Sequence, residues 1–195
     1  MTINAKTLFD PNLEKDNCGF GLIAQRNGKR SRKLVKKSIL GLTSMTHRGA
    51  IGADGKTGDG CGLLFDLNHS FFKLKVVREL DVELPDFFAV AQLFHKNDID
   101  FYYSSIRKFL NSQDLEIAVT RSVPVNNKVL GKIARQNLPN ISQLFITSKN
   151  INLNKERFEA CLLQARKFIE EKFDNDEEFY VCSMSTQTIV YKGLM

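Results

Sequence analysis

The stretch "EKDNCGFGLIAQ", residues 14–25, places one cysteine, Cys18, between a short polar leader and an apolar run. The run "CGFGLIAQRN" predicts a strand that starts at Cys18 and ends in a turn at Asn27 and Gly28, because Asn-Gly tolerates positive φ. The leader, residues 1–17, lacks the apolar central region of a signal peptide. We therefore expect a cytoplasmic protein in which the thiol at the head of the strand has a specific use.

The composition favours one globular domain without a membrane span. The chain has 195 residues, of which 43% are hydrophobic, and this is enough for a sizeable core. Its longest strongly apolar segment, "FFAVAQLF" at residues 87–94, is too short to cross a bilayer and suits a buried strand. Four widely spaced cysteines without a C-x-x-C pair indicate free thiols rather than a zinc site or disulfides.

The net charge of +6 permits a nucleic-acid partner but does not require one. The most basic stretch, residues 26–37, lacks the interleaved aromatic side chains that stack on bases. We interpret it as a solvated turn and helix face and keep polyanion binding as the last of the alternatives.

Strand and helix patterns alternate along the chain and predict an α+β fold with helices covering apolar strands. A helix capped by Ser31 should bury Val35, Ile39, Leu42 and Met45. A longer helix should bury Phe158, Leu162, Ala165, Ile169 and Phe173. The remaining predictions are strands at 63–67, 87–95, 116–124 and 142–148, helices at 99–110 and 128–136, a short amphipathic turn at 69–73, and a closing hairpin of 178–185 with 188–193.

Cys18 needs a base, because a thiol with a pKa of about 8.5 is only a few per cent ionised at neutral pH. Cleavage between Asn17 and Cys18 would free an α-amine with a pKa of about 7.7–8.0, which can serve as that base. This is the chemistry of N-terminal nucleophile hydrolases. Two alternatives stay open: a structural Cys18 packed in a core, which the motif alone favours, and a dyad of Cys18 with His47, which is less favoured than a histidine packed at a helix end.

A glycine-rich loop, "HRGAIGADGKTGDGCG" at residues 47–62, follows the first predicted helix. Arg48 lies where that helix breaks, and its guanidinium can hold a carboxylate, such as that of an amino acid, with two parallel hydrogen bonds. The alternative is a surface arginine that caps the helix. Gly49, Asp59 and Gly60 are assigned to a loop shaped around a small polar substrate.

The same loop does not fit a phosphate-binding motif. A P-loop requires G-x-x-x-x-G-K-[ST], yet the residue five positions before Gly55 is Ala50. The loop also follows a predicted helix instead of a strand. We therefore expect no phosphate site here.

Taken together, "DNCGFGLIA", the basic amphipathic helix and "HRGAIGADGKTGDGCGLLF" resemble the class II glutamine amidotransferase domain that begins the large subunit of glutamate synthase. The likeness extends to the closing "STQTIVYKGL". It implies an N-terminal nucleophile hydrolase fold, a four-layer αββα sandwich. It further implies a propeptide at residues 1–17 and an amidotransferase domain at 18–195 that is incomplete at its C-terminus.

The resemblance implies that Cys18 is the nucleophile and Arg48 the residue that binds the α-carboxylate of L-glutamine. The thiolate attacks the side-chain amide, ammonia leaves, and water releases glutamate from a thioester; the ammonia then reaches 2-oxoglutarate. Cys61 stands where many relatives have a small residue, and we expect it to be packed rather than catalytic. No cofactor is expected in this chain, since FMN and an iron–sulfur cluster belong to downstream domains.

The expected partners are L-glutamine, the remaining domains of the same polypeptide and a small NAD(P)H-oxidising subunit, with no nucleic acid and no membrane. The family's oxyanion-hole pair and an acidic residue near the substrate amine are expected beyond Met195, so residues 1–195 alone should be nearly inactive. Two other functions remain open: a different autoprocessed amide hydrolase, and a non-catalytic remnant that binds a carboxylate ligand.

Overall fold

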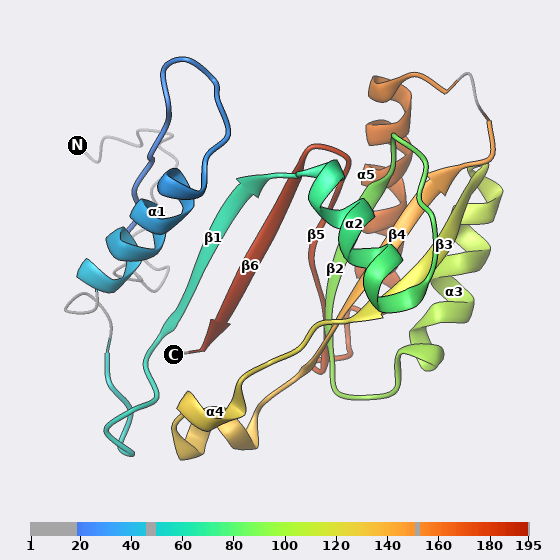
Figure 1. Ribbon diagram of the computed structural model, residues 1–195. Helices are drawn as coiled ribbons and strands as arrows, with labels where there is room; N and C mark the ends of the chain where they lie inside the picture. The colour runs from blue at the N-terminus through green and yellow to red at the C-terminus, as the bar shows by residue number, and fades with distance from the viewer. Residues whose placement is uncertain (1–18, 46–49, 151–152, 195) are drawn as a thin grey trace, which may run out of the picture. The chain divides into compact units, whose positions relative to one another are not determined.

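The computed structural model describes residues 19–45, 50–150 and 153–194 of the chain. The chain divides into two units, residues 1–50 and 51–195, and each is described by itself. The first unit contains helix α1 (Arg32–Ser44), shown in blue in Figure 1. Ser31 caps this helix as predicted, because its hydroxyl accepts a hydrogen bond from the Leu34 amide at 3.2 Å.

Two expectations for the first unit are wrong. Residues 19–25 form no strand, although the predicted turn is present: the Gly28 amide donates to the Gln25 carbonyl at 2.9 Å, and Gly28 has φ of 66°. A strand requires a neighbour to bond its backbone, and the described part of this unit contains no other strand. Within the described part of this unit no residue of α1 is buried, and Ile39 of the expected core stripe is 51% exposed.

The second unit alternates strands and helices in a mixed α+β fold. Its connections are short apart from the one between residues 122 and 140. Among the described residues, no helix has both the length and the hydropathy to cross a bilayer. The elements are β1 (Gly60–Asp66), α2 (His69–Leu80), β2 (Ala89–His95), α3 (Ile99–Ser112), β3 (Leu115–Ser122), the 3₁₀ turn η2 (Asn127–Val129), α4 (Lys132–Gln136), β4 (Asn140–Ser148), α5 (Lys155–Lys172), β5 (Phe179–Ser185) and β6 (Thr188–Leu194).

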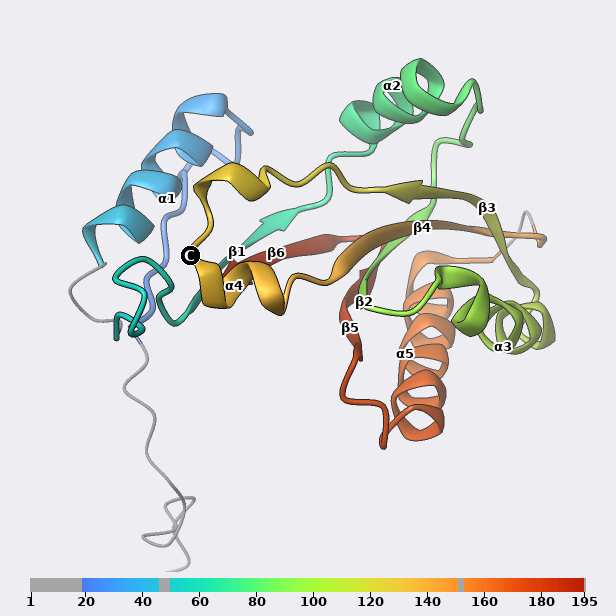
Figure 2. The same ribbon diagram turned by 90° about the horizontal axis from the view of Figure 1, so that it is seen from below.

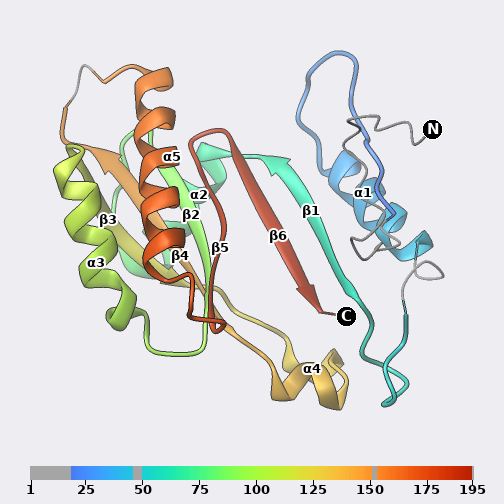
Figure 3. The same ribbon diagram turned by 180° about the vertical axis from the view of Figure 1, so that it is seen from behind.

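Two antiparallel sheets build this unit. One has four strands in the order β3-β4-β2-β5, and the other consists of β1 and β6. Helices α3 and α5 cover one face of the larger sheet, whereas α2 and the β1–β6 pair lie on its other face (Figures 1 and 2). The view from behind in Figure 3 shows α3 and α5 in front of the four strands.

Strand β2 is the centre of both cores, because all seven of its residues are buried. Leu93 faces a cluster that includes Ile106 of α3 and Leu162 of α5. Val90 faces a second cluster, which includes Phe145 of β4 and Ile189 of β6. A strand that is apolar on both faces must be covered on both faces, and this confirms the buried strand predicted at residues 87–95.

Helix α5 buries the stripe that the sequence predicts. Its fully buried residues face the larger sheet, while the opposite side of the helix is in solvent. The neighbours Leu162 and Leu163 show the contrast, with exposed fractions of 0% and 56%. Phe158, Leu162, Ala165 and Ile169 are buried, and Phe173 packs against this cluster from its edge.

The predicted closing hairpin is wrong. Strand β5 pairs with β2 and strand β6 with β1, so the chain passes from one sheet to the other between Ser185 and Thr188. The corner is held by Glu159 of α5, whose carboxylate accepts a hydrogen bond from the Thr186 amide at 2.6 Å and one from the Ser185 hydroxyl. These hydrogen bonds fix the backbone at Ser185 and Thr186, after which the chain continues as β6 in the second sheet.

A row of polar side chains crosses the larger sheet on the face that meets β6. Arg121, Gln143, Gln92 and Ser183 are neighbours in register on four adjacent strands, and each is at least 94% buried. Arg121 donates to Gln143 at 3.0 Å, Gln143 donates to Gln92 at 2.9 Å, and Gln92 donates to the carbonyl of Val190 at 2.9 Å. Since unpaired buried polar groups are costly, this row fixes where β6 lies on the sheet.

Glu79 of α2 ends the row. Its carboxylate accepts a hydrogen bond from Nε of Arg121 at 2.5 Å and lies 2.6 Å from Nζ of Lys75. The hydrogen bond from Arg121, followed by that from Lys75, lowers the pKa of Glu79 to about 2. The buried guanidinium of Arg121 thus forms an ion pair with the carboxylate of Glu79 at the edge of the sheet.

We predict that Leu162→Ala lowers the free energy of unfolding by about 2–5 kcal/mol, because it removes a fully buried side chain and leaves a cavity. Leu163→Ala, one position away on the same helix, should change it by about 0.5 kcal/mol or less. Urea unfolding followed by circular dichroism measures both. Equal effects of the two substitutions would contradict the described orientation of α5.

We also predict that Glu79→Gln destabilises the protein at pH 7 and that this difference disappears in acid. The folded pKa of Glu79 lies below the unfolded value of about 4.3, so its ion pair stabilises the fold above that pH and loses its effect as the pH falls towards 2. Urea unfolding at a series of pH values measures the difference. A difference that does not vary between pH 7 and pH 2.5 would show that the carboxylate is not paired.

Candidate functional site

The predicted site residues divide between described and undescribed parts of the chain. Cys18, Arg48 and Gly49 lie outside the described residues, as do His47 and the leader at 1–17. Asp59 and Gly60 are described and lie in the second unit. The roles of all five predicted site residues therefore remain predictions, and the geometry available is that of the loop leading to β1.

Residues 51–58 of this loop form a small hairpin. Ile51 and Gly58 are joined by an antiparallel bridge, and the Gly52 amide donates to the Thr57 carbonyl at 2.6 Å. The turn is made at Gly55, which has φ of 66° and whose amide donates to the Gly52 carbonyl at 2.9 Å. Positive φ is a conformation that glycine adopts without strain, and this explains the Asp-Gly pair in the sequence.

The carboxylate of Asp54 holds the hairpin together. Its Oδ1 accepts hydrogen bonds from the amides of Thr57 at 2.7 Å and Lys56 at 3.1 Å. Its Oδ2 accepts from the Thr57 hydroxyl at 2.7 Å and from the Ile133 amide at 3.1 Å. The backbone hydrogen bond from Thr57 is the main reason that the pKa of Asp54 lies far below its usual range.

These contacts are also relevant to phosphate binding. A phosphate loop directs its backbone amides at the ligand, but the amides of Lys56 and Thr57 donate to Asp54. The carboxylate of Asp54 thus already accepts hydrogen bonds from two backbone amides that a bound phosphate would otherwise need.

The hairpin packs against the connection between β3 and β4, and Figures 1 and 3 show the loop beside α4. The Thr57 hydroxyl accepts a hydrogen bond from the Ala134 amide at 3.2 Å, and Thr57 is 8% exposed. At Gly131 there is no room for a side chain, because a Cβ would overlap Oδ2 of Asp54 and Oγ1 of Thr57. The predicted helix at 128–136 is wrong in its extent: the backbone is extended at Leu130 and Gly131, which separate η2 from the short helix α4.

Asp59 and Gly60 follow directly after the hairpin. Asp59 is exposed, and Gly60 is the first residue of β1, paired in register with Leu194 of β6. Cys61, the next residue, is partly buried, and burial raises the pKa of its thiol. A raised pKa keeps the thiol protonated and poorly nucleophilic, so Cys61 has the properties of a packing residue.

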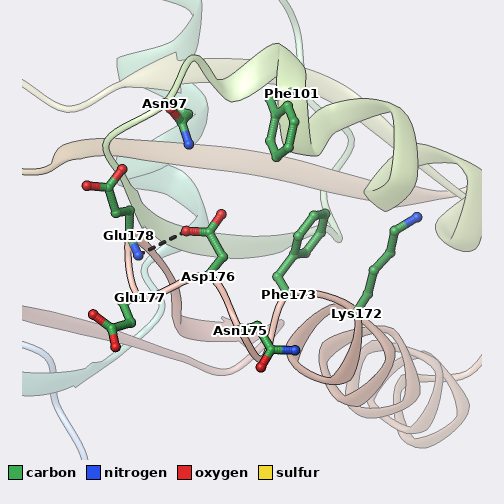
Figure 4. A pocket seen from close by; sticks show the side chains of 8 residues that line it. All are labelled: Asn97, Phe101, Lys172, Phe173, Asn175, Asp176, Glu177 and Glu178. Carbon is green, nitrogen blue, oxygen red and sulfur yellow. Dashed lines mark hydrogen bonds between the residues drawn. The ribbon is translucent and has the colours of Figure 1, made fainter.

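A separate pocket lies where α3 begins and α5 ends (Figure 4). Two of its carboxylates are already used in the fold: Asp176 accepts hydrogen bonds from the Tyr102 hydroxyl at 2.8 Å and from the Glu178 amide at 3.0 Å, and Glu178 is paired with Lys96 at 3.1 Å. None of its lining residues carries a thiol or a hydroxyl, so it lacks a nucleophile for amide hydrolysis. The lining residues are Asn97, Phe101, Lys172, Phe173, Asn175, Asp176, Glu177 and Glu178.

Sequence reasoning missed Asp54, Thr57 and Gly131. The Asp-Gly pair at 54 and 55 signals a turn, but one partner of Asp54, the amide of Ile133, lies 79 residues later in the chain. No local pattern connects the two segments. Only the fold shows that they meet.

Comparison with known proteins places the chain in a family. Residues 18–195 match the family of class II glutamine amidotransferases. The chain is 34% identical to the NADH glutamate synthase of Saccharomyces cerevisiae, with 95% of the chain and 9% of the relative covered. It is 37% identical to the ferredoxin-dependent glutamate synthase of Pyropia yezoensis, with 98% and 13% covered.

A third relative is the NADPH glutamate synthase large chain of Bacillus subtilis, 34% identical with 100% of the chain and 13% of the relative covered. The chain thus spans about a tenth of the length of the curated relatives that it matches. It is homologous to the glutamine amidotransferase part of these enzymes. On this match and on its α+β architecture, the chain belongs to the class II glutamine amidotransferases.

Proposed function

We propose that this chain supplies the glutaminase activity of a glutamate synthase, with Cys18 as the N-terminal nucleophile. The observation that carries the proposal is where the family match begins: its first matched residue is Cys18, and residues 1–17 precede the match. This supports assigning residues 1–17 to a propeptide and residues 18–195 to the amidotransferase domain.

In the proposed reaction, removal of residues 1–17 frees the α-amine of Cys18, which takes the proton of its own thiol. The thiolate forms a bond to the side-chain carbonyl carbon of L-glutamine. The protonated α-amine returns that proton to the amide nitrogen, so the C–N bond breaks and ammonia leaves. Water then hydrolyses the γ-glutamyl thioester, which releases glutamate and restores the thiol. Arg48 is proposed to bind the α-carboxylate of the substrate through two hydrogen bonds.

Asp59 and Gly60, together with Gly49, are proposed to form the loop beside the substrate. The support is the described geometry: Asp59 is exposed at the entrance to β1, after a hairpin that is fixed at both ends. The second sheet is antiparallel and short, and it exposes 65% of Leu64 on its outer face. We propose that a further helical layer covers this face and completes a four-layer αββα sandwich.

The ammonia is proposed to pass to 2-oxoglutarate in other domains of the same polypeptide, in the cytoplasm, with a small NAD(P)H-oxidising subunit as a further partner. FMN and an iron–sulfur cluster are assigned to those domains.

We predict that the active full-length enzyme begins at Cys18 and that a glutamine-analogue electrophile labels that residue. Cys61 and Cys182 should stay unlabelled, since burial raises the pKa of both thiols. Intact-protein mass spectrometry gives the N-terminus, and peptide mapping gives the labelled residue. Cys18→Ala should abolish labelling, whereas Cys61→Ala should retain it; an active enzyme that still carries residues 1–17 would refute the mechanism.

A further inference from the structure

We propose that Asp54 is a positioning residue that sets the affinity for glutamine by fixing the loop that carries Asp59. The Asp54 clasp comprises the contacts of Asp54 with Lys56, Thr57 and Ile133, the hydrogen bond from the Ala134 amide to the Thr57 hydroxyl, and the close approach of Gly131. The inference rests on the proposed function, because it assigns the clasp to the same substrate loop. It adds a segment, residues 131–134, that no sequence motif connects with the site.

The clasp joins two segments that are far apart in the chain. One carboxylate accepts four hydrogen bonds, three from its own hairpin and one from the Ile133 amide, 79 residues away. The Thr57 hydroxyl is used twice, as donor to Asp54 and as acceptor from the Ala134 amide. The Asp54 carboxylate and the Thr57 hydroxyl are therefore both fully used in hydrogen bonds. Moving the hairpin away from residues 131–134 would break the bonds to the amides of Ile133 and Ala134.

The same contacts complete the start of α4. The first amides of a helix have no partner within the helix, and Gly131 provides no side-chain cap for this one. Asp54 and Thr57 accept from the amides of Ile133 and Ala134 instead. Side chains of the hairpin thus satisfy two backbone amides of α4. The absence of a side chain at Gly131 allows the close approach of the two segments.

Asp59 lies between two fixed points. Thr57 is held by the clasp, and Gly60 is paired in the β1–β6 sheet, so only Gly58 and Asp59 separate the two anchors. Gly58 is itself bridged to Ile51. A span this short leaves the backbone of Asp59 little freedom, and its position follows from that of the clasp.

The clasp can be removed without changing any predicted substrate contact. Asp54→Ala deletes the carboxylate, and Thr57→Val keeps the shape of the side chain but loses its hydroxyl. Thr57→Ser retains the hydroxyl and serves as the conservative control. Asp86→Ala is the matched control for an aspartate outside the clasp, since its carboxylate forms an exposed ion pair with Lys73.

The experiment measures glutamine hydrolysis by the full-length enzyme, as KM and kcat separately, together with the melting temperature of each variant. We expect Asp54→Ala and Thr57→Val to lower kcat/KM by about ten- to a hundredfold, mainly through a higher KM, because a displaced loop binds substrate less well. Thr57→Ser and Asp86→Ala should stay close to the wild type.

An unchanged KM in Asp54→Ala and Thr57→Val, or a fall in kcat alone, would overturn the clasp while leaving the proposed function standing. A wild-type enzyme that does not hydrolyse glutamine would instead refute the proposed function. If Asp54→Ala fails to fold, the comparison of Thr57→Val with Thr57→Ser decides the question: a higher KM for valine only supports the clasp, and equal values for both refute it.

Discussion

A glycine-rich loop is costly to order, and the carboxylate of Asp54 is the group that makes this ordering possible at the entrance to β1. It supplies acceptors for two amides of the hairpin and for one amide of the β3–β4 connection. That connection runs between strands of the larger sheet, whereas the hairpin leads into the smaller sheet. One side chain therefore links the ends of both sheets where the substrate loop is proposed to lie.

The sandwich itself depends on burial of both faces of β2. Val90 and Leu93 point to different clusters, one shared with α2 and β6 and the other with α3 and α5. Gln92 is a polar residue within this apolar strand, and its side-chain amide donates a hydrogen bond to the carbonyl of Val190 of β6. Apolar burial thus holds the layers together, and the polar row determines their alignment. The hairpin of residues 51–58 leads into the smaller sheet and is braced by a connection of the larger one, so the alignment of the two sheets also affects this loop.

Local pattern predicts what is determined locally. The period of α5, the apolar run of β2 and the cap at Ser31 could all be read from the sequence, because each follows from spacing or from one side chain. Strand pairing could not be read from the sequence. Residues 178–193 have the pattern of a hairpin, yet β6 pairs with β1 in the other sheet. The turn before β6 is held by Glu159, which is distant in sequence. The helix α2 extends to twelve residues where only a short turn was expected, because its buried Phe72 and Val76 pack on the sheet. For the candidate site, the glycine-rich motif at residues 47–62 indicated the loop. It did not indicate the contacts with Ile133 and Ala134 that hold this loop in place.

Hydrogen exchange of the backbone amides in the full-length protein tests the central claim most directly, because these amides are the donors to the clasp. The amides of Lys56, Thr57, Ile133 and Ala134 should exchange more slowly than in an unfolded chain, and they should become exposed together, as one cooperative unit. Exchange of the Lys56 and Thr57 amides at unfolded-chain rates, while those of β2 stay protected, would contradict the account.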